Sequence, residues 1–200
     1  MVLQCHEESL GKDVFEAILA HRSVRAYTPE VLGRKTVQTL LEAAVRAPTT
    51  MHEEPWAFVV VQNRQMLKLI SDRAKQIFVE EMRQHRAHET NQSFEHYGSP
   101  DFDMFHGAGT LIVICAQPTS GFVAADCWLG AENMMLAACD LGLGSCVIGA
   151  AVSTLNLGKV KTELGIPGEY MAIAPIIVGI SKEPVSASAR KDPLILSWKQ

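Results

Sequence analysis

The chain has 200 residues, of which 48% are hydrophobic and 20% are charged, so it carries enough apolar side chains for one globular domain and is not disordered. Its net charge of -4 at pH 7 argues against nucleic acid as the main partner, because duplex binding normally requires a broad basic face. Residues 1–10 carry acidic side chains and no apolar signal-peptide core, so we expect a cytoplasmic protein with a flexible terminus over 1–12.

The first third of the chain carries the patterns of two helices and a strand. Apolar residues at helical spacing predict helices over 13–19 and 35–47, and Pro48 ends the second. We expect a turn over 27–30 between them. The β-branched and aromatic run 56–61 predicts a strand.

A helix that opens at Asn63 leads into a segment of different composition. Between 74 and 97 the residues Arg, Gln, His and Glu dominate, which predicts an exposed helical excursion, and with its return it spans 74–105. No carboxylate pattern completes a metal site around its histidines, and Cys5-His6-Glu7 lies in a frayed terminus, so we expect no metal. The histidines concerned are His85, His88 and His96.

The interval 104–125 lacks Asp, Glu, Lys and Arg and is long enough for a membrane span to be considered. Glycine, proline and polar residues divide it into a β-rich run over 110–116 and a turn, so we expect a buried strand and no membrane segment. The helix predicted over 126–141 is apolar on most sides, so the sheet and a second subunit are expected to cover it. The five cysteines have no Cys-x-x-Cys spacing and are predicted to be reduced core residues.

Two further strands and a helix are predicted in the last third. A short strand over 145–149 ends in small residues, where Gly149 would let a planar ring approach the backbone or would simply form a tight turn. Ser153 can cap a helix that extends to Leu164, and 171–180 has the length of a central strand, with Pro175 implying a bulge or an edge. The apolar residues of 193–198 have no partner in their own segment and are expected to pack on another copy of the chain.

The segment His21-Arg22-Ser23-Val24-Arg25 has the side chains of an anion site. An arginine fork makes two parallel hydrogen bonds to one phosphate, and a hydroxyl and main-chain amides satisfy other oxygens. The alternative is that Arg22 and Arg25 are only a solvated surface pair. Signatures of other site classes are missing, because no Gly-x-Gly-x-x-Gly follows a strand and no P-loop, Gly-x-Ser-x-Gly or His-Glu-x-x-His occurs.

Four separated segments together resemble the FMN-dependent nitroreductase family in order and spacing. They are 21–27 (His-Arg-Ser-Val-Arg-Ala-Tyr), 47–56 (Ala-Pro-Thr-Thr-Met-His-Glu-Glu-Pro-Trp), 136–145 (Leu-Ala-Ala-Cys-Asp-Leu-Gly-Leu-Gly-Ser) and 165–179, which begins Gly-Ile-Pro-Gly-Glu-Tyr. The resemblance implies an α+β fold, in which helices flank a central, mostly antiparallel sheet. It also implies a single domain over 1–200 that forms a homodimer with FMN at the interface, with the C-terminal segment extending onto the partner and the excursion near the active site.

The resemblance assigns thirteen residues to FMN and no residue to catalysis. In the basic segment, the phosphate and part of the isoalloxazine would be held by His21, Arg22, Ser23 and Arg25. A loop would lie against the flavin of the partner subunit with Thr49, Thr50, His52 and Glu54, and a C-terminal basic pair, Arg190 and Lys191, would also meet the phosphate. A strand end with Val147, Ile148 and Gly149 would border the ring near N5. Arg22, Arg25 and Arg190 are expected to converge on one phosphate. Many relatives carry Asn at the position of His52 and Gln at that of Glu54, which bears on flavin tuning.

The implied activity is hydride transfer from NADH or NADPH through FMN to a nitroaromatic or quinone-like acceptor. Three alternatives stay open at this point. One is a non-enzymatic flavin-binding protein, and another is a different flavin chemistry on the same fold, such as dehalogenation or dehydrogenation. The third is a structural protein whose arginines are surface charges.

Overall fold

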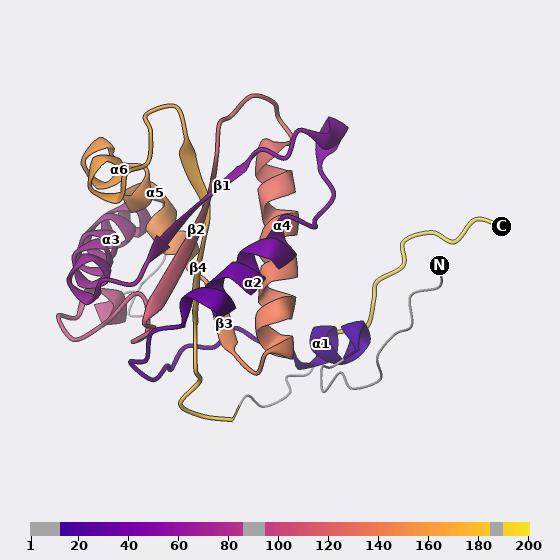
Figure 1. Cartoon of the computed structure of the whole chain (residues 1–200), viewed down its shortest axis with the longest axis horizontal. Helices are drawn as coiled ribbons and strands as arrows, with labels where there is room; N and C mark the ends of the chain where they lie inside the picture. Colours follow the sequence, from indigo (N-terminus) through magenta and orange to yellow (C-terminus); the bar gives the residue numbers. More distant parts are fainter. Residues whose placement is uncertain (1–12, 86–94, 185–189) are drawn as a thin grey trace.

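The computed structural model describes residues 13–85, 95–184 and 190–200, and it places one antiparallel sheet between two layers of helices (Figure 1). The strands are β1 (Trp56–Val61), β2 (Thr110–Ala116), β3 (Gly144–Val147) and β4 (Met171–Gly179). They lie in the order β1-β2-β4-β3, and each neighbouring pair is antiparallel. The predicted α+β fold with an antiparallel sheet is confirmed.

Helices α3, α5 and α6 cover one face of the sheet, and α2 and α4 cover the other (Figure 1). The helices are α1 (Val14–Ala20), α2 (Arg34–Ala44), α3 (Arg64–His85), α4 (Val123–Asp140), α5 (Val152–Leu155) and α6 (Gly158–Leu164), with short 3-10 helices η1 (Thr50–His52), η2 (Glu95–Gly98) and η3 (Gly149–Ala151). None of the helices over the described residues is both long and apolar enough to span a membrane.

Strand β2 shows why the core has two halves. All seven of its residues are buried, and side chains alternate between the faces of a strand. Leu111 and Val113 therefore pack with α3 residues such as Ile70, while Ile112 and Ile114 pack into the cluster under α2 and α4. Each large aliphatic side chain buried in this way contributes about 1.5–3 kcal/mol.

Pro175 was predicted to imply a bulge or an edge; β4 is not an edge strand, and its bulge lies two residues before Pro175, which itself pairs in register with Val113. Strand β4 is interior, because it pairs with both β2 and β3. Ile114 of β2 pairs with Ala174 and the next residue, Cys115, pairs with Ala172, so Ile173 has no partner in β2 and is the extra residue of a bulge. The proline has no N–H to donate, but its carbonyl accepts from the Ile148 backbone N–H at 2.9 Å.

Several predicted element bounds differ from the structure. Helix α2 ends at Ala44, before the predicted end at 47, and the single helix predicted to begin at Ser153 is two short helices, α5 and α6. Asn156 explains the second difference, since its side chain donates to the Ala172 carbonyl and accepts from the Ala172 N–H, both at 2.9 Å. This clamp fixes the chain between α5 and α6 to the sheet.

The segment predicted as an exposed excursion begins inside a longer helix. Helix α3 continues through 74–85, and Ala74 and Lys75 are buried rather than exposed, because this part of the helix packs beside η3 and α5. Residues 1–12 and 86–94 lie outside the described part of the chain. The predictions about Cys5-His6-Glu7 and His88 therefore concern residues for which the structure says nothing.

Apolar side chains remain exposed on α4, on α1 and in the segment 190–200. Helix α4 buries one side against α2 and the sheet, but Trp128 and Leu129 are 41% and 47% exposed. Segment 190–200 extends away from the sheet, and its Trp198 is 75% exposed (Figure 1). The expectation that most sides of α4 are covered does not hold for a single chain.

Candidate functional site

The basic segment lies along the end of the sheet as an extra extended strand. Ser23 forms a parallel bridge with Ser145 of β3, and the Val24 N–H donates to the Ser145 carbonyl at 3.0 Å. Val24 and Tyr27 point into the core, and the Tyr27 hydroxyl donates to the Val24 carbonyl at 2.9 Å. Because Val24 points inward, its neighbours Ser23 and Arg25 face outward and are exposed.

The same segment is also fixed to the residues that follow β4. Tyr27 forms an antiparallel bridge with Ser181, where a turn over 27–30 was expected. The Thr28 N–H donates to the Ile180 carbonyl at 2.9 Å, and the Lys182 N–H donates to the Ala26 carbonyl at 3.0 Å. The backbone that carries Arg22 and Arg25 is thus held at both β3 and the end of β4.

A cavity of about 360 Å³, which we call the Arg25 hollow, opens between this segment, the end of β3 and a set of aromatic side chains. Arg25 lines it together with Cys146 and the residues that follow, and three of those were predicted from the sequence as flavin neighbours: Val147, Ile148 and Gly149. A Cβ atom placed on Gly149 would meet nothing within 4 Å. Four of the thirteen predicted residues therefore share one cavity.

Aromatic rings form the opposite wall of the Arg25 hollow. The ring centroids of Phe78 and Tyr97 are 5.2 Å apart, those of Tyr97 and Phe102 are 5.1 Å apart, and those of His96 and Phe102 are 4.8 Å apart, all edge to face. Such pairs stabilise beyond the area that they bury. His106 continues the chain of rings, with its centroid 5.7 Å from that of Phe102.

Arg25 provides positive charge to the hollow, and its effect reaches several neighbours. Burial raises the pKa of the Cys146 thiol, while Arg25 and a hydrogen bond with Ser23 act in the opposite direction. Burial lowers the pKa of His106, and Arg25 and His96 lower it further against the opposing effect of Asp103. His106 is therefore neutral at pH 7, and Arg25 carries the positive charge in this cavity.

A second cavity of about 220 Å³, the His21 hollow, lies beside the N-terminal end of the basic segment. His21 and Arg22 line it together with Gly142, in the turn between α4 and β3, and Gly144, the first residue of β3. The His21 Nε2 atom is buried and forms no hydrogen bond with any described residue, while the Nδ1 atom of the same ring lies 3.8 Å from a Glu132 carboxylate oxygen. Buried polar atoms normally have partners, so the His21 Nε2 atom indicates a place for a polar ligand.

The loop with Thr49, Thr50, His52 and Glu54 lies elsewhere in the chain. Its Thr50 N–H and hydroxyl donate to the buried Asp126 carboxylate of α4, at 3.2 Å and 3.3 Å. Asp126 is in the first turn of α4, whereas the helix end at Asp140 leads into β3; these positions are about 20 Å apart along the helix axis. The single chain therefore does not bring this loop to the Arg25 hollow.

The loop has an unusual backbone and is open to solvent. Met51, His52 and Glu54 have φ angles of 53°, 58° and 45°, in the left-handed region that side chains with a Cβ rarely adopt. His52 and Glu54 are both exposed. Strained, exposed residues of this kind are frequent where a loop contacts a ligand or partner.

Arg190 and Lys191 are exposed in the segment 190–200 and line neither the Arg25 hollow nor the His21 hollow. The expected convergence of Arg22, Arg25 and Arg190 is therefore not observed within one chain. The assignment of the C-terminal basic pair to a phosphate stays a prediction.

The sequence reasoning missed most of the aromatic wall. The residues it did not single out for the site are Phe78, Tyr97, Phe102, Met104, His106 and Cys146. The available signal was the placement of 74–105 near the active site, which covers all of these except His106 and Cys146. No periodicity identifies which of those side chains meet Arg25, because they come from α3, η2 and the following turn.

The family model of the Nitroreductase family matches residues 18–180. Among curated relatives, an Archaeoglobus fulgidus protein with NAD(P)H nitroreductase in its name is 27% identical over 177 residues, covering 86% of this chain and 87% of the relative. A Bacillus subtilis FMN reductase (NADPH) is 26% identical over 184 residues, covering 91% of this chain and 70% of the relative.

Solved structures show the same fold. A Bacteroides fragilis nitroreductase with bound FMN superposes with a TM-score of 0.79 at 28% identity, covering 94% of this chain and all of that chain, 100%. An iodotyrosine deiodinase bound to FMN and 3-iodo-L-tyrosine superposes with a TM-score of 0.69 at 18% identity, covering 94% and 99%, which is a likeness of fold alone. The family match extends from α1 to the end of β4 and confirms the resemblance. This chain belongs to the Nitroreductase family.

Proposed function

We propose that this protein binds FMN and transfers electrons from NADH or NADPH to a nitroaromatic or quinone-like acceptor in the cytoplasm. The observation that carries the proposal is the Arg25 hollow, which joins one exposed guanidinium, a strand end and an aromatic wall in 360 Å³. Bound FMN in the Bacteroides fragilis relative supports the cofactor. When bound, FMN supplies two-electron hydride chemistry to the site.

The residues present fit a phosphorylated, planar cofactor. The His21 hollow offers a buried imidazole atom that lacks a described partner, beside the Arg22 side chain, so these residues and Ser23 would hold the phosphate. Arg25 and the 147–149 segment would border the ring, and the open space at Gly149 leaves room for it. The alternative that Arg22 and Arg25 are only a solvated surface pair does not account for the two cavities beside them or for the buried His21 Nε2 atom without a described partner.

The chain's own residues contribute charge and shape. The backbone on either side of Arg25 is fixed by hydrogen bonds at Val24 and Ala26, and the Arg25 guanidinium would stabilise negative charge that develops on the bound ring. Phe78, Tyr97 and Phe102 would exclude water and stack on a flat acceptor. We assign no catalytic acid or base.

A homodimer would complete the site. The 49–54 loop and the basic segment lie at opposite ends of α4, so a second copy related by a two-fold axis can bring its loop to the first copy's hollow. The exposed apolar side chains of α1, α4 and 190–200 would then be covered. Light scattering should give twice the mass of one chain, and deletion of 190–200 should shift the mass towards the monomer and lower flavin content.

The deiodinase fold favours one second candidate, which is reductive dehalogenation or another flavin chemistry at the same site. A non-enzymatic flavin protein is the remaining alternative. Negligible oxidation of NADH and NADPH, with a quinone present, would separate both from the proposed activity.

The test starts from the absorbance spectrum of the protein as purified. We expect a flavin spectrum that bleaches anaerobically on addition of NADH or NADPH and recovers with a quinone. Arg25→Ala should weaken FMN binding by about tenfold or more, because a hydrogen bond to a charged group is lost. The control is Arg34→Ala, an exposed arginine that lines neither hollow. Unchanged flavin content in the Arg25→Ala protein would contradict the assignment.

A further inference from the structure

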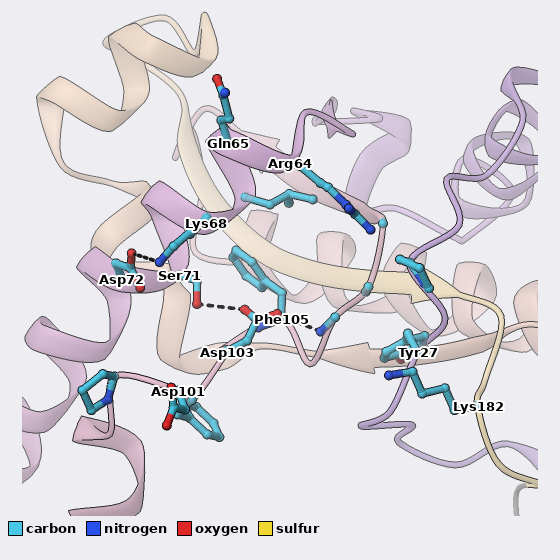
Figure 2. Close-up of a pocket in the computed structure, with 17 residues that line it drawn as sticks. Tyr27, Arg64, Gln65, Lys68, Ser71, Asp72, Asp101, Asp103, Phe105 and Lys182 are labelled. Carbon is cyan, nitrogen blue, oxygen red and sulfur yellow. Dashed lines mark hydrogen bonds and ion pairs between the residues drawn. The ribbon is translucent and has the colours of Figure 1, made fainter.

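A third cavity, the α3 hollow, lies between the first turns of α3 and the segment 100–109 (Figure 2). Its volume of about 570 Å³ exceeds that of the Arg25 hollow and falls among those of small-molecule sites, about 300–1,000 Å³. Phe102 lines both cavities, so the two are neighbours. None of the residues that the resemblance assigns to FMN lines the α3 hollow.

Helix α3 provides one long wall of the α3 hollow. The wall includes Arg64, Leu67, Lys68, Ser71 and Asp72, whose spacing of three and four residues places them on one helix face. From the first to the last of them the helix rises by about 12 Å. The cavity is therefore elongated along the helix, with an arginine at one end of the wall and an aspartate at the other.

The facing wall is a tight turn that Asp103 holds in place. Its Oδ1 atom accepts from the Ser71 hydroxyl at 2.9 Å and from the Phe105 N–H at 3.0 Å, and its Oδ2 atom accepts from the Gly107 N–H at 2.7 Å. Gly107 has a φ of 79°, which favours glycine, and His106 shares this left-handed conformation. The wall is thus formed before any ligand binds.

Two cations stand at one end of the α3 hollow. Figure 2 shows the side chains of Arg64 and Lys182 on the side of Tyr27, away from Asp72 and Asp101. No hydrogen bond or ion pair joins the side chain of Arg64 or Lys182 to another residue in the described parts of the chain. This end of the cavity can therefore receive an anionic group.

The other end carries a carboxylate that is equally available. Asp101 is exposed and has no bonded partner among the described residues, whereas Asp72 is already paired with Lys68 at 2.6 Å and Lys75 at 3.0 Å. Between the two ends Leu67 and Phe105 line the cavity and are almost fully buried, and the polar side chains there are already bonded: Ser71 donates to Asp103, and Lys68 pairs with Asp72. The cavity thus has two cations without described partners at one end, a carboxylate without a described partner at the other, and the apolar side chains of Leu67 and Phe105 between them.

We infer that the α3 hollow binds a linear zwitterion, a small molecule with a carboxylate and an ammonium group separated by an aliphatic chain. The carboxylate would lie at Arg64 and Lys182, the ammonium at Asp101, and the chain along Leu67 and Phe105. Charge-assisted hydrogen bonds at both ends supply affinity. A ligand with one charge, or with negative charge at both ends, leaves an end unmatched or repelled.

The probe is 6-aminohexanoate, titrated calorimetrically into the protein as purified, with hexanoate and hexylamine as ligands that each lack one charge. We expect 6-aminohexanoate to bind at least about tenfold more tightly than hexanoate or hexylamine, because each of these two ligands lacks one of the charged contacts. No binding of 6-aminohexanoate, or equal binding of all three ligands, overturns the inference. The readout is heat of binding, so it stands whether or not the protein oxidises NADH or NADPH.

Three variants locate the bound probe. Arg64→Gln and Lys182→Gln should each weaken 6-aminohexanoate binding about tenfold, whereas Asp101→Asn should weaken it without changing hexanoate binding. Arg34→Gln is the matched control, since Arg34 is the first residue of α2 as Arg64 is of α3, and it does not line the cavity. Circular dichroism establishes that each variant folds. Wild-type affinity in both the Arg64→Gln and Lys182→Gln proteins would place the probe elsewhere and refute the site.

Discussion

Replacement of Gly144 by alanine tests whether the packing of the basic segment on β3 forms the site. Gly144 is the first residue of β3, next to the bridge between Ser23 and Ser145. An alanine Cβ at this position would lie 2.8 Å from Val24 Cγ2 and 2.9 Å from both Val24 Cβ and Cγ1. No rotation of the valine relieves a contact with its own Cβ, so the backbone must move.

The expected cost follows from that contact. Overpacking by one methyl group in a closely packed region costs about 1–3 kcal/mol. Alanine gives the unfolded chain less conformational entropy than glycine does, which offsets about 0.4–1 kcal/mol of this cost. We therefore expect Gly144→Ala to lower the free energy of unfolding by about 1–2 kcal/mol. Because Ser23 and Arg25 flank Val24, the shift should also reduce the flavin bound per chain.

Urea denaturation gives the free energy of unfolding, and the ratio of flavin absorbance to protein gives the occupancy. The control is Gly158→Ala, because a Cβ there meets nothing within 4 Å and alanine favours the helix α6 that begins at this residue. We expect this control to be as stable as the wild type or slightly more stable, with unchanged flavin. A Gly144→Ala protein within about 0.5 kcal/mol of the wild type and with full flavin would refute the reasoning.

Three further outcomes are expected. Asp126→Asn should lower the free energy of unfolding by about 1–2 kcal/mol in urea, because the buried carboxylate accepts from both the Thr50 N–H and hydroxyl. The pKa of His106 is lowered in the folded state, so the unfolded state binds more protons and the free energy of unfolding falls as the pH drops below the ordinary histidine value of 6.5. The His106→Gln protein should lose less stability than the wild type on the order of the histidine titration range, between pH 7.5 and 5. An equal loss in the two proteins would contradict this. Burial raises the pKa of Cys115 to about 11, so mass spectrometry should show slower iodoacetamide labelling there at about pH 8 than at half-buried Cys139.

Local patterns in the sequence were sufficient for the strands β1 and β2, whose observed bounds match the predicted ranges 56–61 and 110–116. Both are short runs of β-branched and apolar residues between turn signals, and their conformation is fixed by neighbours in the chain. The resemblance also anticipated the fold and its antiparallel sheet. It identified Arg25 and the strand end at 147–149, which share one cavity.

Where long-range contacts decide the conformation, the sequence patterns were less informative. The break between α5 and α6 depends on Asn156 bonding the backbone of Ala172 in β4, a contact that no local pattern contains. Helix α3 continues past Ala74 because η3 and α5 cover it there, although the composition of the segment favours exposure.

The sequence alone determined which residues could bind an anion, because the types and spacing of Arg22, Ser23 and Arg25 are local properties. Only the tertiary structure decided what surrounds them: β3 on one side, the rings of Phe102 and His106 on another, and the 49–54 loop at the far end of α4. Those arrangements depend on strand pairing and helix packing between distant parts of the chain. Hydrophobic periodicity records which face of an element is buried and not which other element covers it.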